Sequence, residues 1–91
     1  MQGLRGRESP DPYAAMLFVF DADVRVAFTM AGVPADLEIG FYDAAGRRVD
    51  RQTMRSCSGT DATCPVYRAR AAFRFALETK PGELPAGRLS G

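Results

Sequence analysis

The chain lacks histidine and tryptophan, and Lys80 is the only lysine among its 91 residues. Without histidine, its serines and cysteines have no base of the kind that activates a nucleophile, so we expect no serine or cysteine hydrolase chemistry. Two cysteines are too few for the three or four protein ligands of a zinc site. The acidic residues Asp21, Asp23 and Asp61 do not follow the calcium-loop pattern. The sequence therefore predicts no metal site and no cofactor.

The chain also lacks a long apolar run. The longest one, residues 14–20, is much shorter than the ~20 residues that a membrane span needs. Residues 1–7 carry charges with no apolar segment behind them, so we identify no signal sequence in this chain. The net charge is +1, from 12 basic and 11 acidic residues, which argues against binding to nucleic acid or anionic lipid. We expect no membrane span and no nucleic-acid partner.

Arginine supplies almost all of the positive charge and gathers in two stretches of the sequence. These are Arg47, Arg48, Arg51 and Arg55, and then Arg68, Arg70 and Arg74. Because acidic residues lie between them, we interpret both stretches as solvated or salt-bridged faces. Binding of a small anion or a sugar stays open as an alternative.

The length and the globular composition indicate one domain, residues 1–91. Glycine and proline interrupt residues 1–15, which we interpret as an irregular arm, and residues 16–91 form the predicted β core. Alternating or short apolar runs predict strands at residues 17–20, 24–30, 37–42, 47–54 and 72–79. We predict a mostly β domain with a small antiparallel sheet, curled or barrel-like, because an open sheet of this size would expose its edges.

The same alternation predicts which side chains form the core. The set is Leu17, Val19, Val26, Phe28, Ile39, Phe41, Val49, Phe73, Phe75 and Leu77. Among them Phe28, Phe41 and Phe75 should be buried, while Arg25, Glu38 and Arg74 should face solvent. The segment 43–46 reads as a turn, and Arg51 should pair across this hairpin with Glu38 or Asp36.

Cys57 and Cys64 enclose six small or polar residues, Ser-Gly-Thr-Asp-Ala-Thr. A short loop of this composition favours a disulfide, and a disulfide indicates an oxidising, extracytoplasmic compartment, either exported or periplasmic. Free thiols are one alternative. A redox pair is another, although the spacing is not Cys-x-x-Cys and no histidine or lysine nearby would lower a thiol pKa.

Four ordered segments resemble a prokaryotic family, the domain of unknown function 192 (DUF 192). Residues 3–7, Gly-Leu-Arg-Gly-Arg, are similar to its G-L-M-x-R segment, and residues 15–20, Ala-Met-Leu-Phe-Val-Phe, to its G-M-L-F-x-F strand. Residues 28–43 align without gaps on its F-W-M-K-N-T…L-D-I-x-F-x-D block. The turn at 43–46, the Cys57…Cys64-Pro65 loop and residues 75–78 follow in family order. The resemblance covers almost the whole chain and implies an exported or membrane-anchored protein, with no activity to carry over.

The chain departs from this family in its polar signature. Where the family has Trp, Lys, Asn and Thr, this sequence has Thr29, Ala31, Gly32 and Val33, and only Met30 remains. The family's opening strand and its closing G-D-x-V strand are also missing, so residues 1–91 resemble the middle of a longer domain. A site that used those polar side chains would be lost here.

The function predicted is a non-catalytic binding or accessory module for a small molecule or glycan. Residues 30–36, which join the second and third predicted strands, should line the pocket, because loops on a rigid sheet carry most ligand contacts. The candidate ligand-binding residues are Met30, Asp36, Glu38, Tyr42 and Arg51. The alternative is an enzyme that uses carboxylates on a polysaccharide or cell-wall substrate, since residues two apart on a strand, such as Asp36 and Glu38, share a face.

Overall fold

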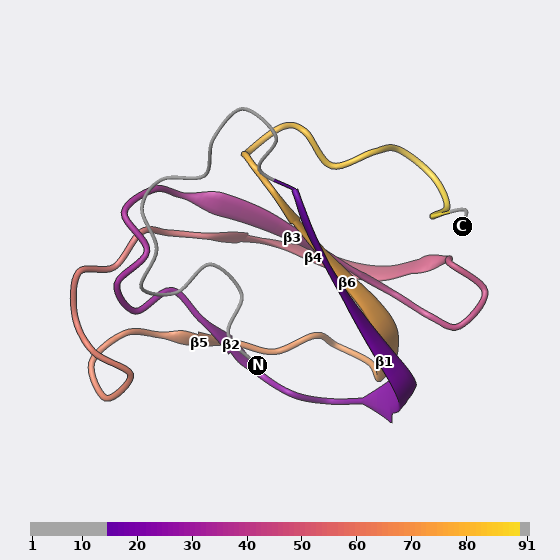
Figure 1. Cartoon of the computed structure of the whole chain (residues 1–91), viewed down its shortest axis with the longest axis horizontal. Coiled ribbons are helices and arrows are strands. Elements are labelled where there is room, and N and C mark those ends of the chain that lie inside the picture. Colours follow the sequence, from indigo (N-terminus) through magenta and orange to yellow (C-terminus); the bar gives the residue numbers. More distant parts are fainter. Residues whose placement is uncertain (1–14, 90–91) are drawn as a thin grey trace.

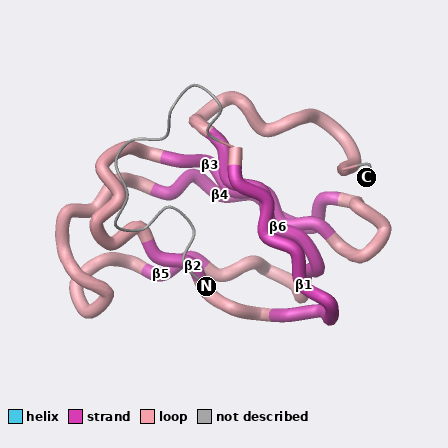
Figure 2. Tube along the Cα trace, in the orientation of Figure 1, coloured by secondary structure: helices cyan, strands magenta, loops and turns pink. Residues whose placement is uncertain are grey.

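The computed structural model describes residues 15–89, and this part of the chain contains strands and loops but no helix (Figures 1 and 2). The predicted arm, residues 1–15, lies outside the described residues except for Ala15. The strands are β1 (Met16–Val24), β2 (Phe28–Thr29), β3 (Leu37–Tyr42), β4 (Arg48–Met54), β5 (Val66–Tyr67) and β6 (Phe73–Thr79). The mostly β fold predicted from the sequence is confirmed.

The strands form two antiparallel sheets. The larger sheet has the order β1-β6-β3-β4, and the smaller pairs β2 with β5. The sheets do not close into a barrel. They pack as two layers instead, because the Phe28 ring of β2 packs at a tilt against the Phe41 ring of β3, with ring centroids 5.8 Å apart. Phe18 of β1 meets the Phe28 ring edge-on, with ring centroids 5.4 Å apart. The small sheet therefore covers one face of the large one.

The turn between β3 and β4 has the structure that its sequence predicts. The Asp43 carboxylate accepts hydrogen bonds from the backbone N–H groups of Ala45 and Arg47, both at 2.9 Å. Gly46 adopts a φ of 80°, a left-handed conformation that glycine tolerates without strain. A short aspartate-glycine turn therefore sets the register of the hairpin.

The core lies between the sheets and follows one face of the large sheet. Its fully buried members include Met30, Leu37, Ile39, Phe41, Met54 and Phe73. Phe28 and Phe41 are buried as predicted, and Arg25 is exposed as predicted. Arg74 is half-buried rather than solvent-facing, because its guanidinium contacts the Asp23 carboxylate at 3.1 Å.

The predicted choice of core-facing side chains was wrong for β1 and for part of β6. Leu17 and Val19 are 52% and 64% exposed, because Met16, Phe18 and Phe20 face the core instead. That run is apolar at every position, so alternation could not select a face. The predicted core residue Val26, in the loop after β1, is 36% exposed.

On β6, the predicted core residue Phe73 is fully buried, whereas Phe75 and Leu77, also predicted for the core, are half-buried on the other face. Phe75 is paired with Tyr42, and Leu77 with Gly40. The β1–β6 pairing is irregular between Val19 and Val24, which interrupts the strict alternation beside Phe73.

Cys57 and Cys64 form the predicted disulfide, which closes the loop between β4 and β5. In the chain-entropy account, closing a loop of this length stabilises the folded state by about 2–3 kcal/mol. We therefore expect the double variant Cys57→Ser, Cys64→Ser to lose about that much free energy of unfolding in urea titrations. A reductant should destabilise the native chain by a similar amount and leave the double variant unchanged. Equal stability of the native chain with and without reductant would contradict this role.

Candidate functional site

The loop before β3 and the loop after β4 enclose an open hollow of about 430 Å³. We call it the loop hollow. It is lined by Gly32, Val33, Pro34, Ser56, Cys57 and Ser58. Three consecutive residues of the predicted pocket segment, 32–34, therefore do line a surface hollow. None of the lining side chains is charged, and two of them are serine hydroxyls.

Backbone hydrogen bonds hold the two walls of the loop hollow together. The N–H of Gly32 donates to the Cys57 carbonyl at 2.9 Å, and the N–H of Cys57 donates to the Val33 carbonyl at 3.4 Å. Cys57 is in turn tied to Cys64 by the disulfide, and Cys64 is buried. The disulfide thus links the wall of the hollow at Cys57 covalently to Cys64, at the other end of the cysteine loop.

Asp36 fixes the second wall of the loop hollow, which is the loop after β4. Its carboxylate accepts a hydrogen bond from the N–H of Ser56 at 2.8 Å and pairs with the Arg55 guanidinium at 3.1 Å. The Ser56 backbone N–H, together with Arg55, holds the pKa of Asp36 below its usual value. A carboxylate in this state accepts hydrogen bonds but is a poor general acid at neutral pH. Asp36 therefore positions Ser56.

Met30 was predicted to line the pocket together with the rest of residues 30–36. In the structure it lies beneath that segment. Its side chain is 1% exposed and belongs to the core. Its carbonyl accepts a hydrogen bond from the Val33 N–H at 2.9 Å. This bond closes a turn that directs the chain toward the wall of the loop hollow. Met30 thus shapes the loop through its backbone and anchors it through its side chain.

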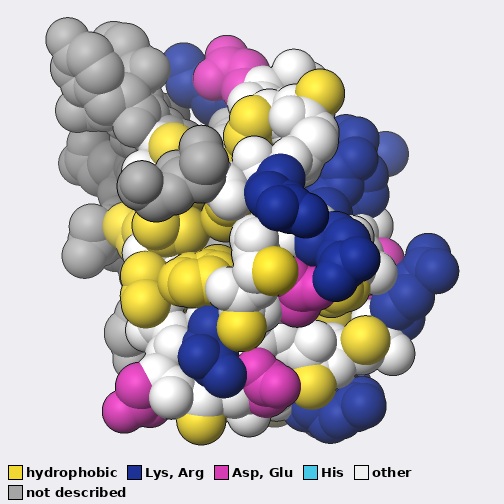
Figure 3. All heavy atoms as spheres, turned by 90° about the vertical axis from the view of Figure 1, so that its right-hand side faces the viewer, with side chains coloured by type: hydrophobic (Ala, Val, Ile, Leu, Met, Phe, Trp, Pro, Cys, Tyr) yellow, Lys and Arg dark blue, Asp and Glu magenta, His cyan; other side chains and the backbone are white. Residues whose placement is uncertain are grey.

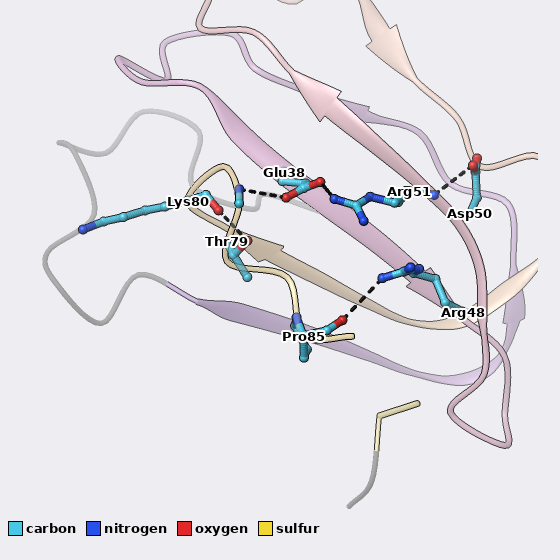
Figure 4. Close-up of polar contacts among 8 residues, drawn as sticks. Glu38, Arg48, Asp50, Arg51, Thr79, Lys80 and Pro85 are labelled. Carbon is cyan, nitrogen blue, oxygen red and sulfur yellow. Dashed lines mark hydrogen bonds and ion pairs between the residues drawn. The ribbon is translucent and has the colours of Figure 1, made fainter. Parts of the chain in front are cut away.

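Glu38 and Arg51 form the ion pair predicted across the hairpin (Figure 4). The other carboxylate oxygen of Glu38 accepts the Gly82 N–H at 3.0 Å, from the turn that follows β6. This turn covers Glu38, whose exposure is only 6%, so its predicted solvent exposure was wrong. Glu38 thus holds one residue of the C-terminal segment, residues 80–89, against the face of the large sheet that points away from the core.

Tyr42 lies on the same face of β3 as Glu38 and is fully buried. Its ring covers Gly40: a Cβ added there would stand 2.6 Å from the Tyr42 hydroxyl oxygen. A side chain at position 40 would therefore displace the ring. The Tyr42 hydroxyl has no hydrogen-bond partner within the described part of the chain.

The five predicted ligand-binding residues therefore do not converge. Glu38, Tyr42 and Arg51 share the outer face of the large sheet, Met30 lies in the core, and Asp36 supports the loop hollow. Their role in ligand binding stays a prediction.

Sequence reasoning missed Glu78, a carboxyl group on the core face of β6. It is paired with Met16 and with Ile39, and it is 3% exposed. Its Oε1 has no hydrogen-bond partner among residues 15–89, and burial raises the pKa of Glu78 to about 7. The alternation of residues 72–79 placed this residue on the polar face, so no local signal would have found it.

No cluster of three or more acidic or cysteine side chains that could hold a metal ion occurs within residues 15–89. In the same residues, no helix is long and apolar enough to cross a membrane.

A family model matches residues 1–90, which is nearly the whole chain. The model is that of DUF192, described as "Uncharacterized ACR". Searches of curated proteins and of solved structures gave no significant match. The resemblance found in the sequence motifs is thereby confirmed, and the chain belongs to the DUF192 family.

Proposed function

We propose that this chain is an extracytoplasmic, non-catalytic binding module that holds a small neutral ligand, such as a sugar, in the loop hollow. The observation that carries the proposal is the hollow itself, a braced depression of about 430 Å³ with an uncharged lining. This volume falls within the range typical of small-molecule sites. Serine hydroxyls at its wall suit the hydroxyl groups of a carbohydrate, and the exposed Pro34 suits an apolar ring face.

The disulfide supports the extracytoplasmic part of the proposal. Disulfides persist in oxidising compartments and are rare in reducing ones. Cys57 and Cys64 are the only cysteines, and they are bonded to each other. Thiol labelling in intact and lysed cells tests it: both cysteines should resist labelling until a reductant is added. Labelling without reductant would count against export.

A carboxylate enzyme is the less supported alternative. Asp36 and Glu38, the carboxylates predicted for it, are both engaged in ion pairs and backbone hydrogen bonds. Glu78 has the raised pKa that a general acid needs, but it lies in the core and does not line the loop hollow. A binding role needs no free acid or base, so it fits the geometry better.

Titration of the isotope-labelled protein with neutral saccharides, such as glucose and the disaccharide of N-acetylglucosamine, tests the proposal by amide NMR shifts. We expect amide shifts confined to Gly32, Val33 and residues 56–58. The variant Ser58→Trp should fill the hollow and weaken binding by about tenfold or more, which corresponds to about 1.4 kcal/mol.

The matched control is Ala62→Trp, which adds the same ring at an exposed position in the same cysteine loop. It should leave saccharide binding unchanged. Equal loss in both variants, or no shifts with any saccharide, would contradict the proposed site. Turnover of an ester, phosphate or glycoside substrate that Asp36→Asn or Glu38→Gln abolishes would favour the enzyme instead.

A further inference from the structure

The C-terminal segment folds back onto the turn between β3 and β4. The N–H of Leu89 donates to the Gly46 carbonyl at 2.8 Å. Figure 4 shows a second contact, in which an Arg48 guanidinium nitrogen donates to the Pro85 carbonyl at 3.4 Å. A Cβ added at Gly46 would stand 2.2 Å from the Leu89 carbonyl oxygen. Only glycine therefore permits this approach, and the segment is held where it forms a wall beside the turn.

Between the turn and this wall lies a second hollow, of about 300 Å³, which we call the arginine hollow. Its lining residues are Arg47, Arg48, Gly87 and Arg88. Figure 1 shows the turn and the C-terminal end on one side of the molecule, and Figure 3 shows Lys and Arg side chains gathered on that side. Three arginines from two segments that are far apart in sequence therefore border one depression.

The positive charge of this hollow is only partly compensated. Arg47 pairs with Asp43 at 3.3 Å, and its side chain is still 69% exposed. Arg48 contacts a backbone carbonyl, and Arg88 has no carboxylate partner within residues 15–89. Among residues 15–89, three guanidinium charges against the one carboxylate charge of Asp43 leave a formal excess of two positive charges.

We propose that the arginine hollow binds a doubly charged oxyanion of the phosphate class, held by Arg47, Arg48 and Arg88. Guanidinium groups are planar forks that donate paired hydrogen bonds to phosphate oxygens, and several of them around one depression suit a tetrahedral dianion. The charge of the anion matches the local excess, whereas a simple carboxylate would match half of it. Gly87 adds a wall with no side chain, so the anion can approach the backbone there.

This site is independent of the loop hollow. Residues 32–34 precede β3, whereas Arg47 and Arg48 follow it, and no residue lines both hollows. The phosphate site therefore does not depend on a neutral ligand at the other end of the strand.

Amide NMR titration with inorganic phosphate at low ionic strength tests the proposal. We expect shifts at residues 46–48 and 87–89 that follow a single-site binding curve. The variant Arg88→Gln should weaken phosphate binding by about fivefold, and Arg47→Gln with Arg88→Gln should abolish it. Arg88→Lys should restore only part of the affinity, because an ammonium lacks the fork geometry. Parallel titrations with glycerol phosphate and with glycerol distinguish a phosphate ester from the free ion.

The matched control is Arg25→Gln, which removes one exposed positive charge from the loop after β1. It should leave phosphate binding unchanged, whereas a general effect of net charge would weaken binding in both variants equally. That equal weakening, shifts spread over all arginines, or no shifts at saturating phosphate would each overturn the proposal. Arg88 is exposed, so unchanged amide spectra of Arg88→Gln without phosphate should show that its fold is intact.

Discussion

Replacing Phe73 with alanine should lower the free energy of unfolding by about 3–5 kcal/mol. Phe73 is fully buried, and its ring centroid lies 4.8 Å from that of Phe41 and 5.8 Å from that of Phe20. It also meets Phe28 of the small sheet at 6.2 Å, so one ring joins three strands and both layers. Truncation removes the apolar contact and leaves a cavity that the surrounding rings fill only in part. Urea titration followed by fluorescence or circular dichroism measures the loss.

Phe75→Ala, two residues along the same strand, is the matched comparison. Phe75 is half-buried and lies opposite Tyr42 on the outer face, so its loss should be smaller, on the order of 1–2 kcal/mol. The two variants remove the same atoms, and only their position differs. If Phe75→Ala proved as costly as Phe73→Ala, the assignment of faces along β6 would be wrong.

The accuracy of sequence-based prediction differed between the strands for a physical reason. In residues 37–42, apolar side chains alternate with Glu38 and Gly40, and both the bounds of β3 and its core face were predicted correctly. In β1 every position from Met16 to Phe20 is apolar, so the period was absent and the wrong face was chosen. The alternation of residues 24–30 predicted one strand there, but β2 has only two residues, Phe28–Thr29, and the two-residue strand β5 was not predicted at all.

The features of the candidate sites that depend on local sequence were predicted correctly. The disulfide and the Glu38–Arg51 pair follow from loop length and hairpin register, and both are present. The burial of Glu38 under Gly82 depends on where the C-terminal segment folds, which no local pattern encodes. The arginine hollow has the same cause, because Arg88 lies beside Arg47 through the contacts of the C-terminal segment with the turn, Leu89 with Gly46 and Pro85 with Arg48.

The stability of this protein should fall as the pH rises from about 4.5 to about 7, and Glu78→Gln should remove that fall. In the folded state burial raises the pKa of Glu78 from 4.5 to about 7, with no hydrogen-bond partner for Oε1 among residues 15–89. Between these two pH values the unfolded chain has released the proton and the folded chain has not. The folded state therefore loses about 1.4 kcal/mol per pH unit relative to the unfolded state, or about 3 kcal/mol in all, and the loss is complete above about pH 7.

Glutamine has the shape of the protonated side chain and cannot ionise, so the variant should lack this contribution to the pH dependence. Its buried amide has unmet hydrogen bonds of its own and costs a similar amount at every pH, so the slope, not the absolute stability, is diagnostic. Urea titrations between about pH 4 and pH 8 give the slope for each protein. Glu83→Gln, which removes an exposed carboxylate from the turn after β6, is the control and should keep the native slope. Parallel profiles for Glu78→Gln and the native chain would mean that Glu78 ionises at the same pH in both states, which requires a partner for its buried carboxylate.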